Sequence, residues 1–249
     1  MSDRTIVITG ASAGIGAALG ERLSARGDRV LLVARREKEL REVASRCAGR
    51  GHVVVADVTS RDEVRRVVRE ALAQLGRVDV WVNNAGRGIT RPVSQLTDDD
   101  VDEMMRVNVK SALYGMQEIL PHFIERGAGQ IINVSSMLGR VPAASFRSAY
   151  NGAKHFLNAI TANLRDELRE QYPGITVSLV SPGVVATEFG VNATYGGPDS
   201  RSLPMSQPVE EVAEVIERVI DTRATDVYTR RGMRQMVIDY FSALGQDPS

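Results

Sequence analysis

A glycine-rich turn near the start of the chain restricts the fold more than any other segment. The apolar run Ile6-Val7-Ile8 leads into TGASAGIG, residues 9–16, and a helical pattern of apolar residues follows. Gly10 permits a tight turn, Gly14 lets backbone N–H groups approach a pyrophosphate, and Gly16 allows a helix to pack closely on a strand. The segment therefore predicts a strand, a phosphate-binding turn and a helix.

The rest of the chain alternates between strand-like runs and helical patterns. Strands are expected over residues 30–34, 53–56, 78–82, 129–135, 174–181 and 226–229. Helices are expected over 38–47, 62–75, about 100–125 behind an acidic cap at 97–100, 149–171 and, at the C-terminus, 232–245. Such alternation is typical of an α/β protein whose parallel sheet is covered by helices on both faces. We expect residues 1–249 to form a single domain.

Composition narrows the choice of partners. Lys plus Arg and Asp plus Glu both number 31, so the formal net charge is zero, and nucleic acid or an anionic membrane is not an expected partner. The single cysteine, Cys47, excludes an intrachain disulfide. His52, His122 and His155 lack metal-ligand spacing, so no metal is expected. The first four residues enter the first strand directly and no apolar run approaches ~18 residues, which favours a cytoplasmic protein.

Tyr150 and Lys154 form the clearest candidate for chemistry. They are four residues apart, which places both side chains on one face of a helix, and Lys154 is one of three lysines in the chain. A free tyrosine titrates near pH ~10, and a neighbouring cation lowers that pKa toward the operating pH, as general acid–base catalysis requires. The pair therefore predicts an acid and the group that tunes it, with an exposed helical pair as the alternative.

Further short motifs occur in a fixed order. They are TGASAGIG at 9–16, NNAG at 83–86, Asn108, IINVSS at 131–136, Tyr150 with Lys154, and SPGVVAT at 181–187. In this order the chain resembles the short-chain dehydrogenase/reductase family over roughly residues 4 to 230, with the glycine spacing T-G-x-x-x-G-x-G in place of G-x-G-x-x-G. The resemblance implies a Rossmann-type, doubly wound parallel sheet of about seven strands in the order 3-2-1-4-5-6-7. It also implies hydride transfer between a nicotinamide nucleotide and a carbonyl or secondary alcohol.

The resemblance assigns the catalytic roles. Tyr150 is the acid in reduction and the base in oxidation, while Lys154 lowers the pKa of Tyr150 and holds the nicotinamide ribose. Ser136 donates a hydrogen bond to the substrate oxygen, and Asn108 anchors a water in a proton relay. Ser136 precedes Tyr150 by fourteen residues, one more than in some relatives, so Ser135 is the alternative. We favour Ser136 and expect Ser135 to be a structural hydroxyl at a strand end.

The resemblance also assigns cofactor contacts. Asp57 corresponds to the acid beside the adenine ring, residues 84–86 to a segment that steadies the central strand, and Thr187 to the threonine on the nicotinamide carboxamide. A strand-end cap at Asp57, an Asx-type turn at 83–84 and a helix or loop start at Thr187 are the alternatives. The full expected set is Gly10, Ser12, Ala13, Gly14, Ile15, Gly16, Arg35, Arg36, Asp57, Val58, Asn84, Ala85, Gly86, Tyr150, Lys154, Pro182, Gly183, Val185 and Thr187.

The end of the second strand bears on the choice of nucleotide. Ala34 stands where an NAD enzyme of this family places a carboxylate for the ribose hydroxyls, and Arg35 and Arg36 follow it. Guanidinium groups match a 2′-phosphate in charge and geometry, so we predict a preference for NADP, with NAD as the weaker alternative. Ala13 counts against this preference, because many NADP-dependent relatives carry Arg or Lys there.

Two apolar stretches are candidates for the substrate site. Residues 188–208 are rich in Gly and Pro, which indicates a lid, and residues 138–146 could form the opposite wall. The expected substrate contacts are Ser136, Leu138, Phe146, Tyr150, Phe189 and Tyr195. A hydrophobic ketone, aldehyde or alcohol would fit, although the same side chains could instead pack the lid down. No charged residue clearly marks a coenzyme A, carrier-protein or sugar-phosphate group.

Assembly and alternative functions follow from the same patterns. The apolar stripe at 232–245 predicts a helix that packs on its own domain or on another subunit, with a membrane-surface role as the alternative. Relatives commonly associate through the two long helices, so a homodimer or homotetramer is expected. A ketoreductase acting on acyl thioesters and a non-catalytic NADP(H)-sensing regulatory protein are the alternative functions, and the complete set of Asn108, Ser136, Tyr150 and Lys154 argues against the sensor.

Overall fold

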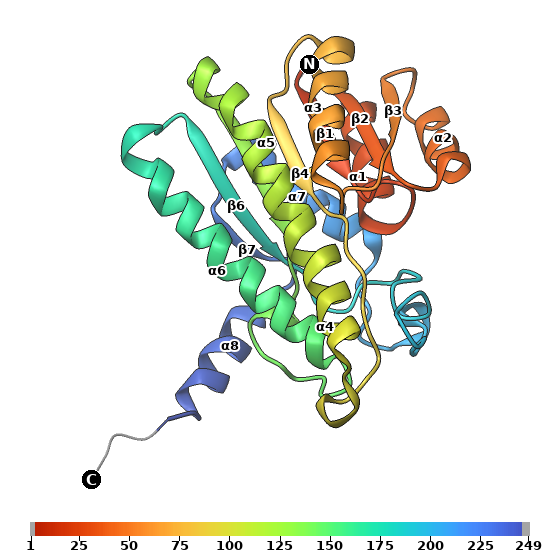
Figure 1. Cartoon of the computed structure of the whole chain (residues 1–249), viewed down its shortest axis with the longest axis vertical. Helices are drawn as coiled ribbons and strands as arrows, with labels where there is room; N and C mark the ends of the chain where they lie inside the picture. Colours follow the sequence, from red (N-terminus) through yellow and green to blue (C-terminus); the bar gives the residue numbers. More distant parts are fainter. Residues whose placement is uncertain (1–2, 246–249) are drawn as a thin grey trace.

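A seven-stranded parallel sheet runs through the computed structural model, which describes residues 3–245 (Figure 1). Its strands are β1 (Thr5–Thr9), β2 (Arg29–Ala34), β3 (Gly51–Val55), β4 (Val80–Asn83), β5 (Gly129–Val134), β6 (Ile175–Ser181) and β7 (Asp226–Tyr228). They lie in the order β3-β2-β1-β4-β5-β6-β7, and every neighbouring pair is parallel. The predicted Rossmann-type sheet and its strand order are therefore confirmed.

Helices cover both faces of this sheet. They are α1 (Gly14–Ala25), α2 (Glu37–Ser45), α3 (Arg61–Leu75), α4 (Asp98–Met105), α5 (Ser111–Arg126), α6 (Ser148–Gln171), α7 (Val209–Thr222) and α8 (Met233–Ser242). One core lies between the sheet and α1, α2 and α7, and a second lies between the sheet and α3, α5 and α6 (Figure 1). Helix α7 was missed in the sequence prediction, although Val212, Ile216 and Val219 repeat at helical spacing and are buried.

The long helix predicted near residues 100–125 is interrupted. Helix α4 is followed by a π-helical turn over Arg106–Lys110 and then by α5. The predicted cap at its start is confirmed, because the Thr97 hydroxyl accepts from the Asp100 amide at 3.3 Å and the Asp100 carboxylate accepts from the Thr97 amide at 3.0 Å. A π-turn widens the helix locally and is frequent at functional sites; here it contains Asn108.

A chain of buried polar side chains joins the sheet to α5 and α6. The Trp81 indole donates to Asn83 at 2.7 Å, Asn83 donates to the Asn133 side chain at 2.8 Å, and Asn133 donates to the Thr161 hydroxyl at 2.8 Å. A Cβ at Gly115 would lie 2.2 Å from the Asn83 side-chain oxygen, so only glycine lets α5 approach this chain. These bonds fix α6, which carries Tyr150 and Lys154, against β5.

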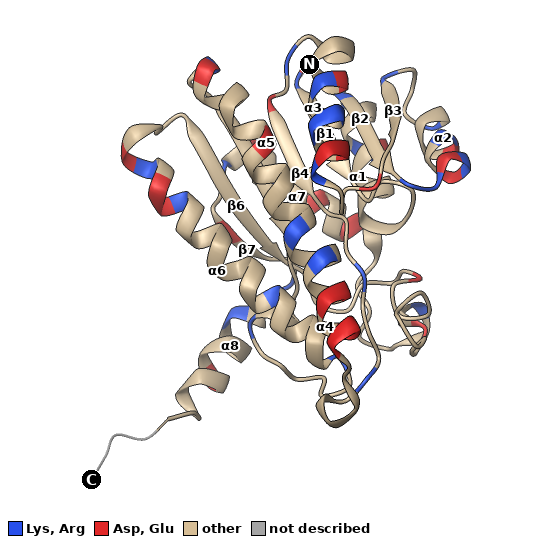
Figure 2. Ribbon diagram, in the orientation of Figure 1, with Lys and Arg blue, Asp and Glu red and all other residues tan. Residues whose placement is uncertain are grey.

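The lid segment, residues 188–208, contains only a short 3₁₀ turn, Ser200–Ser202. Ile89 forms an isolated bridge with Thr194, and Val185 forms one with Gln207, so the lid is tied to the body near its middle and at its end. Within residues 3–245 no helix is both long enough and apolar enough to cross a membrane. Acidic residues gather on α4, whereas residues of both signs are interspersed along α3 (Figure 2).

The C-terminal helix differs from the expectation. It spans Met233–Ser242 within the predicted 232–245, of which residue 245 is the last described, and it projects away from the sheet (Figure 1). Met233 is its one buried residue, while Met236, Ile238 and Phe241 are exposed. Packing of the whole stripe on its own domain is therefore wrong, and a subunit interface stays a prediction.

Candidate active site

The carboxyl ends of the strands open into a cavity of about 1490 Å³. Its walls come from the turn between β1 and α1, the ends of β2, β4, β5 and β6, the first turns of α6, the lid and the start of α8. Ligands of open α/β sheets bind at this edge, where the strand order reverses. All the predicted site residues line the cavity except Gly16, Asn108 and Tyr195.

The glycine turn has the geometry that its sequence predicts. Gly10 and Gly14 have φ angles of 67° and 55°, in the left-handed region that favours glycine. A Cβ at Gly16 would lie 2.6 Å from the Gly10 carbonyl oxygen, so Gly16 serves close packing and does not reach the cavity. Helix α1 begins at Gly14 without a side-chain cap, which leaves backbone N–H groups at its positive end for an anion.

Two residues lock the ends of β1 and β4 together. The Thr9 hydroxyl accepts from the backbone amides of Asn84 at 3.0 Å and Ala85 at 3.2 Å. The Asn84 side chain donates to the carbonyls of Thr9 at 3.0 Å and Gly10 at 3.2 Å. A Cβ at Gly10 would lie 2.8 Å from the Ala85 Cα, so the contact requires glycine. Asn84 thus steadies the central strands directly below the cavity.

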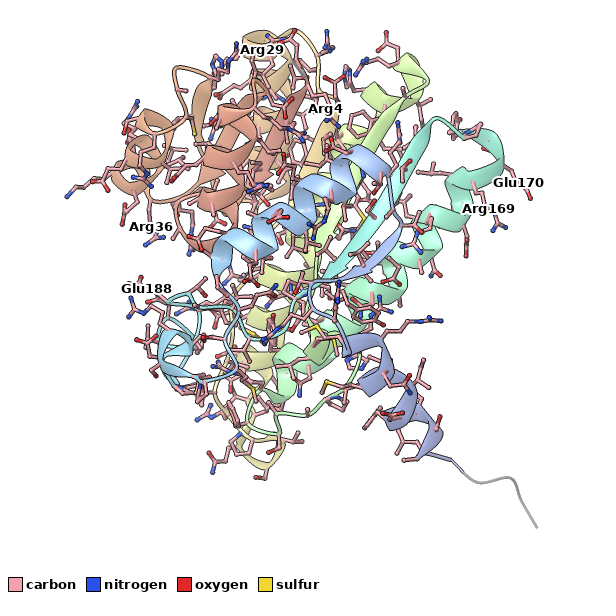
Figure 3. All side chains as sticks on the ribbon, turned by 180° about the vertical axis from the view of Figure 1, so that it is seen from behind. Arg4, Arg29, Arg36, Arg169, Glu170 and Glu188 are labelled. Atoms are coloured by element: carbon pink, nitrogen blue, oxygen red, sulfur yellow. The ribbon has the colours of Figure 1, made fainter. Side chains whose placement is uncertain are left out.

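The two arginines after β2 flank the glycine turn. Arg36 donates to the Ser12 hydroxyl at 3.2 and 3.0 Å, and Arg35 lies 4.0 Å from Asp57. Figure 3 shows Arg36 beside this end of the sheet and Glu188 on the lid below it. Asp57 accepts from the amide and hydroxyl of Thr59 at 3.0 and 2.8 Å, which is the strand-end cap considered as its alternative role.

Tyr150, Ser136 and Lys154 meet at the floor of the cavity. Tyr150 lies in the first turn of α6, is 6% exposed and lies close enough to Ser136, which follows β5, for the Ser136 hydroxyl to affect its pKa. The Lys154 ammonium donates to the Val134 carbonyl at 3.0 Å and lies 5.7 Å from the centre of the Tyr150 ring. The structure therefore brings the predicted acid, the predicted hydrogen-bond donor and the predicted cation together.

Burial dominates the titration of this pair. Desolvation raises the pKa of Tyr150 to about 12, although the Ser136 hydroxyl and the Arg147 charge act in the opposite direction. Desolvation lowers the pKa of Lys154 to about 8. The cost of burying a phenolate exceeds the effect of the Arg147 charge, and the role of Lys154 in lowering the pKa of Tyr150 stays a prediction. Tyr150 keeps its proton at neutral pH, as an acid must.

Asn108 and Ser135 are held by the protein itself. The Asn108 side-chain oxygen accepts from the Arg87 amide at 3.1 Å, and its nitrogen donates to the Arg87 carbonyl at 2.9 Å. A Cβ at Gly86 would lie 2.9 Å from the Asn108 oxygen and 3.6 Å from the Lys154 nitrogen, so both groups approach Gly86. The Ser135 hydroxyl donates to the Asn158 side chain at 2.5 Å, as expected of a structural hydroxyl.

The apolar wall contains three of the four predicted apolar contacts. Leu138, Phe146 and Phe189 line the cavity, and the Phe189 ring lies 5.4 Å from the Tyr150 ring, centre to centre. Tyr195 is a correction, because its side chain lies outside the cavity. Its hydroxyl accepts from Arg91 at 2.8 Å and donates to Asp100 at 2.9 Å, so the cluster of charges turns the ring away.

Sequence reasoning missed several cavity residues. They are chiefly Arg147 beside Tyr150, Met205 and Arg201 on the lid, and Arg230, Met233 and Met236 at the start of α8. The position of Arg147 three residues before Tyr150 was an available signal, because it places an arginine one helical turn from the acid. Its burial could not be inferred from the sequence. Among residues 3–245, no cluster of three or more His, Cys, Asp or Glu side chains could hold a metal.

Comparisons with known proteins define the class. A family model described as short chain dehydrogenase matches residues 4–195. An uncharacterized oxidoreductase of Staphylococcus aureus is 30% identical over 231 residues, which cover 92% of this chain and 98% of the relative. The chain belongs to the short-chain dehydrogenase/reductase family and is an oxidoreductase of that family.

Solved structures agree with this assignment. A short-chain dehydrogenase from Streptomyces avermitilis superposes with a TM-score of 0.85 at 30% identity, covering 97% of this chain and 94% of that one. A 3-ketoacyl-(acyl-carrier-protein) reductase from Brucella melitensis complexed with NADH has a TM-score of 0.80 at 26% identity, covering 92% of this chain and 98% of that one. The sheet and the cavity therefore have the arrangement of a nicotinamide nucleotide-binding fold.

Replacing Lys154 by Met should make the protein more stable at pH 7, because it removes a buried charge. The pKa of Lys154 falls from 10.5 to about 8 on folding, which corresponds to a cost on the order of 3 kcal/mol. The full cost is present below pH 8, where the folded and unfolded states both bind the proton. It is lost as pH rises from 8 to about 10.5, because only the unfolded state then keeps the proton.

Denaturant unfolding of wild type and Lys154→Met at pH 7 and pH 10 measures this difference. The difference in free energy of unfolding between Lys154→Met and wild type should be large at pH 7 and small at pH 10. Lys38→Met is the matched control, since Lys38 is exposed on α2, and it should show no such pH dependence. A gap for Lys154→Met that is constant between the two pH values would contradict the account.

Proposed function

We propose that this protein is an NADP(H)-dependent oxidoreductase that transfers a hydride between the nicotinamide and a carbonyl or secondary alcohol of a small molecule. The observation that carries the proposal is the contact of Tyr150 with Ser136 beside the buried Lys154, at the end of the cavity that begins at the glycine turn. A sensor needs no buried acid, so this contact favours an enzyme over a regulatory protein.

The cavity suits a nicotinamide dinucleotide. Uncapped N–H groups at the start of α1 provide a pyrophosphate site, and the two left-handed glycines let the backbone approach it. When bound, the nucleotide supplies or accepts the hydride. Ser136 and Tyr150 bind the substrate oxygen, and Tyr150 donates its proton to that oxygen as negative charge develops. Lys154 places a positive charge behind Tyr150. Its ammonium group approaches Gly86, where it would contact the ribose of the nicotinamide.

The preference for NADP rests on charge at the end of β2. Arg35 and Arg36 line the cavity, and the Ser12 hydroxyl beside Arg36 adds a neutral hydrogen-bonding group. No carboxylate stands at Ala34, where it would repel a 2′-phosphate. Arg35 is 67% exposed and its ion pair with Asp57 is long at 4.0 Å, so its guanidinium can turn to a phosphate at little cost.

A ketoreductase on acyl thioesters is the second candidate. The likeness to the 3-ketoacyl-(acyl-carrier-protein) reductase supports it. Assembly as a homodimer or homotetramer and residence in the cytoplasm remain part of the proposal.

Tyr150→Phe should abolish turnover while nucleotide binding remains. Loss of a general acid typically lowers the rate by about 10²–10⁴-fold, and the Phe ring preserves the packing against Phe189. Loss of NADPH absorbance should be followed with ketones, aldehydes and acyl thioesters, alongside NADPH fluorescence titrations of both proteins. Equal turnover by wild type and variant would exclude Tyr150 as the acid, whereas binding without turnover by wild type across the panel would favour the sensor.

Arg36→Ala and Arg35→Ala should each lower the ratio of kcat/KM for NADPH to that for NADH. A charge-assisted hydrogen bond contributes about 1.5–3 kcal/mol, so a decrease of roughly tenfold or more is expected for an arginine that contacts the phosphate. Arg41→Ala is the control, because Arg41 lies on α2 outside the cavity lining and pairs with Glu37. An unchanged ratio in both cavity variants would exclude the proposed phosphate site.

A further inference from the structure

Arg147 is a buried arginine in the wall of the cavity. It precedes α6 directly, is 7% exposed and donates one hydrogen bond, from its guanidinium to the Ile89 carbonyl at 3.3 Å. No carboxylate among residues 3–245 forms an ion pair with it within 4.0 Å. Among the other cavity arginines, Arg87 pairs with Glu103 and Arg201 pairs with both Asp199 and Glu188, whereas Arg106 and Arg230 form no ion pair within the described residues but are exposed to water. Arg147 therefore stands apart as a buried guanidinium that no described carboxylate compensates.

This arrangement is unfavourable unless another group completes it. A guanidinium has five N–H donors and stays protonated in proteins, so it needs several acceptors when it leaves water. Burial lowers the pKa of Arg147, and the one charge that acts in the opposite direction is that of Tyr150. A tyrosine that keeps its proton at neutral pH supplies no counter-charge, so no residue of the described part of the chain provides the anion.

Arg147 lies near the reacting centre. It lies one helical turn before Tyr150, and both side chains line the cavity. A Cβ at Gly88 would lie 2.9 Å from one guanidinium nitrogen and a Cβ at Gly197 would lie 3.0 Å from another, so glycines on the body and on the lid make room for the group. Phe146 and Phe189 line the same region, so the Arg147 guanidinium lies beside apolar rings.

We propose that Arg147 recognises a carboxylate and that the substrate is an oxo acid, or the corresponding hydroxy acid. This deepens and rests on the proposed function, since the carbonyl of the same molecule would meet Ser136 and Tyr150. In the reduction, hydride from NADPH forms the new C–H bond, the C=O π bond breaks, and Tyr150 gives its proton to the oxygen. The carboxylate is unchanged and remains paired with the guanidinium, whose planar donors match its two oxygens.

The charge around Arg147 favours a monoanion over a phosphate. One guanidinium balances one carboxylate, whereas a phosphate near pH 7 carries up to two negative charges. The apolar wall suits the short carbon chain that separates the carboxylate from the carbonyl.

The first test compares 2-, 3- and 4-oxo acids with their methyl esters at saturating NADPH. For at least one pair, wild type should favour the acid in kcat/KM by about 10- to 150-fold, the range that a charge-assisted hydrogen bond supplies. Arg147→Gln should bring this ratio close to one, and Arg147→Lys should retain part of it. The control is Arg201→Gln, which removes a cavity arginine that is half exposed and already paired, and it should leave the ratio as in wild type.

The second test does not depend on turnover. Calorimetric titration of butanoate and of butanamide into the NADP⁺-loaded protein should show that only butanoate binds, and Arg147→Gln should abolish that binding. If no carbonyl compound turns over but butanoate binds through Arg147, the anion site is correct and the proposed function is wrong. If esters react as well as acids in wild type, or butanamide binds as well as butanoate, the anion site is wrong. The wild-type comparisons decide the matter even if Arg147→Gln fails to fold, which thermal melting would reveal.

Discussion

The junction between Thr9 and Asn84 is the interaction on which the site depends. It lies where the strand order reverses between β1 and β4, and one hydroxyl and one amide satisfy the backbone groups of both strand ends. A buried hydrogen bond contributes about 1 kcal/mol to stability, but a buried group that loses its partner costs more than that. Removal of either side chain would therefore leave several buried backbone groups unsatisfied. Without this junction the end of β4 would no longer hold the glycine turn in place, and the part of the cavity that faces the turn would lose its shape.

Burial at the other end of the cavity sets the chemistry. The same low-polarity surroundings keep Tyr150 protonated, weaken the proton affinity of Lys154 and leave Arg147 in need of an anion. In such surroundings each charge interacts more strongly than it would in water, so hydrogen bonds to a developing alkoxide gain in value. The cost of burying these groups is a stability cost that the fold accepts for catalysis.

Local sequence patterns were sufficient for the sheet and for most of the site. The glycine turn and the Tyr150–Lys154 spacing each encode geometry within a few residues, and alternating apolar runs predicted the strands. The strand order and most of the cavity lining were predicted from the family resemblance that the ordered motifs carry. The position of Tyr195 could not, because Asp100 and Arg91, distant in sequence, hold its ring away. The direction of the Tyr150 pKa shift and the burial of Arg147 depend on the summed packing of separate segments, which no local pattern reports.

Deuterium transfer would test the central claim most directly. Wild-type protein would be incubated with NADPH carrying deuterium at both C4 positions and with the best carbonyl substrate, and the product examined by mass spectrometry and NMR. The account predicts one deuterium at the former carbonyl carbon in the wild-type product and no labelled product from Tyr150→Phe. Bound NADPH that keeps both deuterium atoms with every carbonyl compound, or a product labelled equally by the variant, would contradict it.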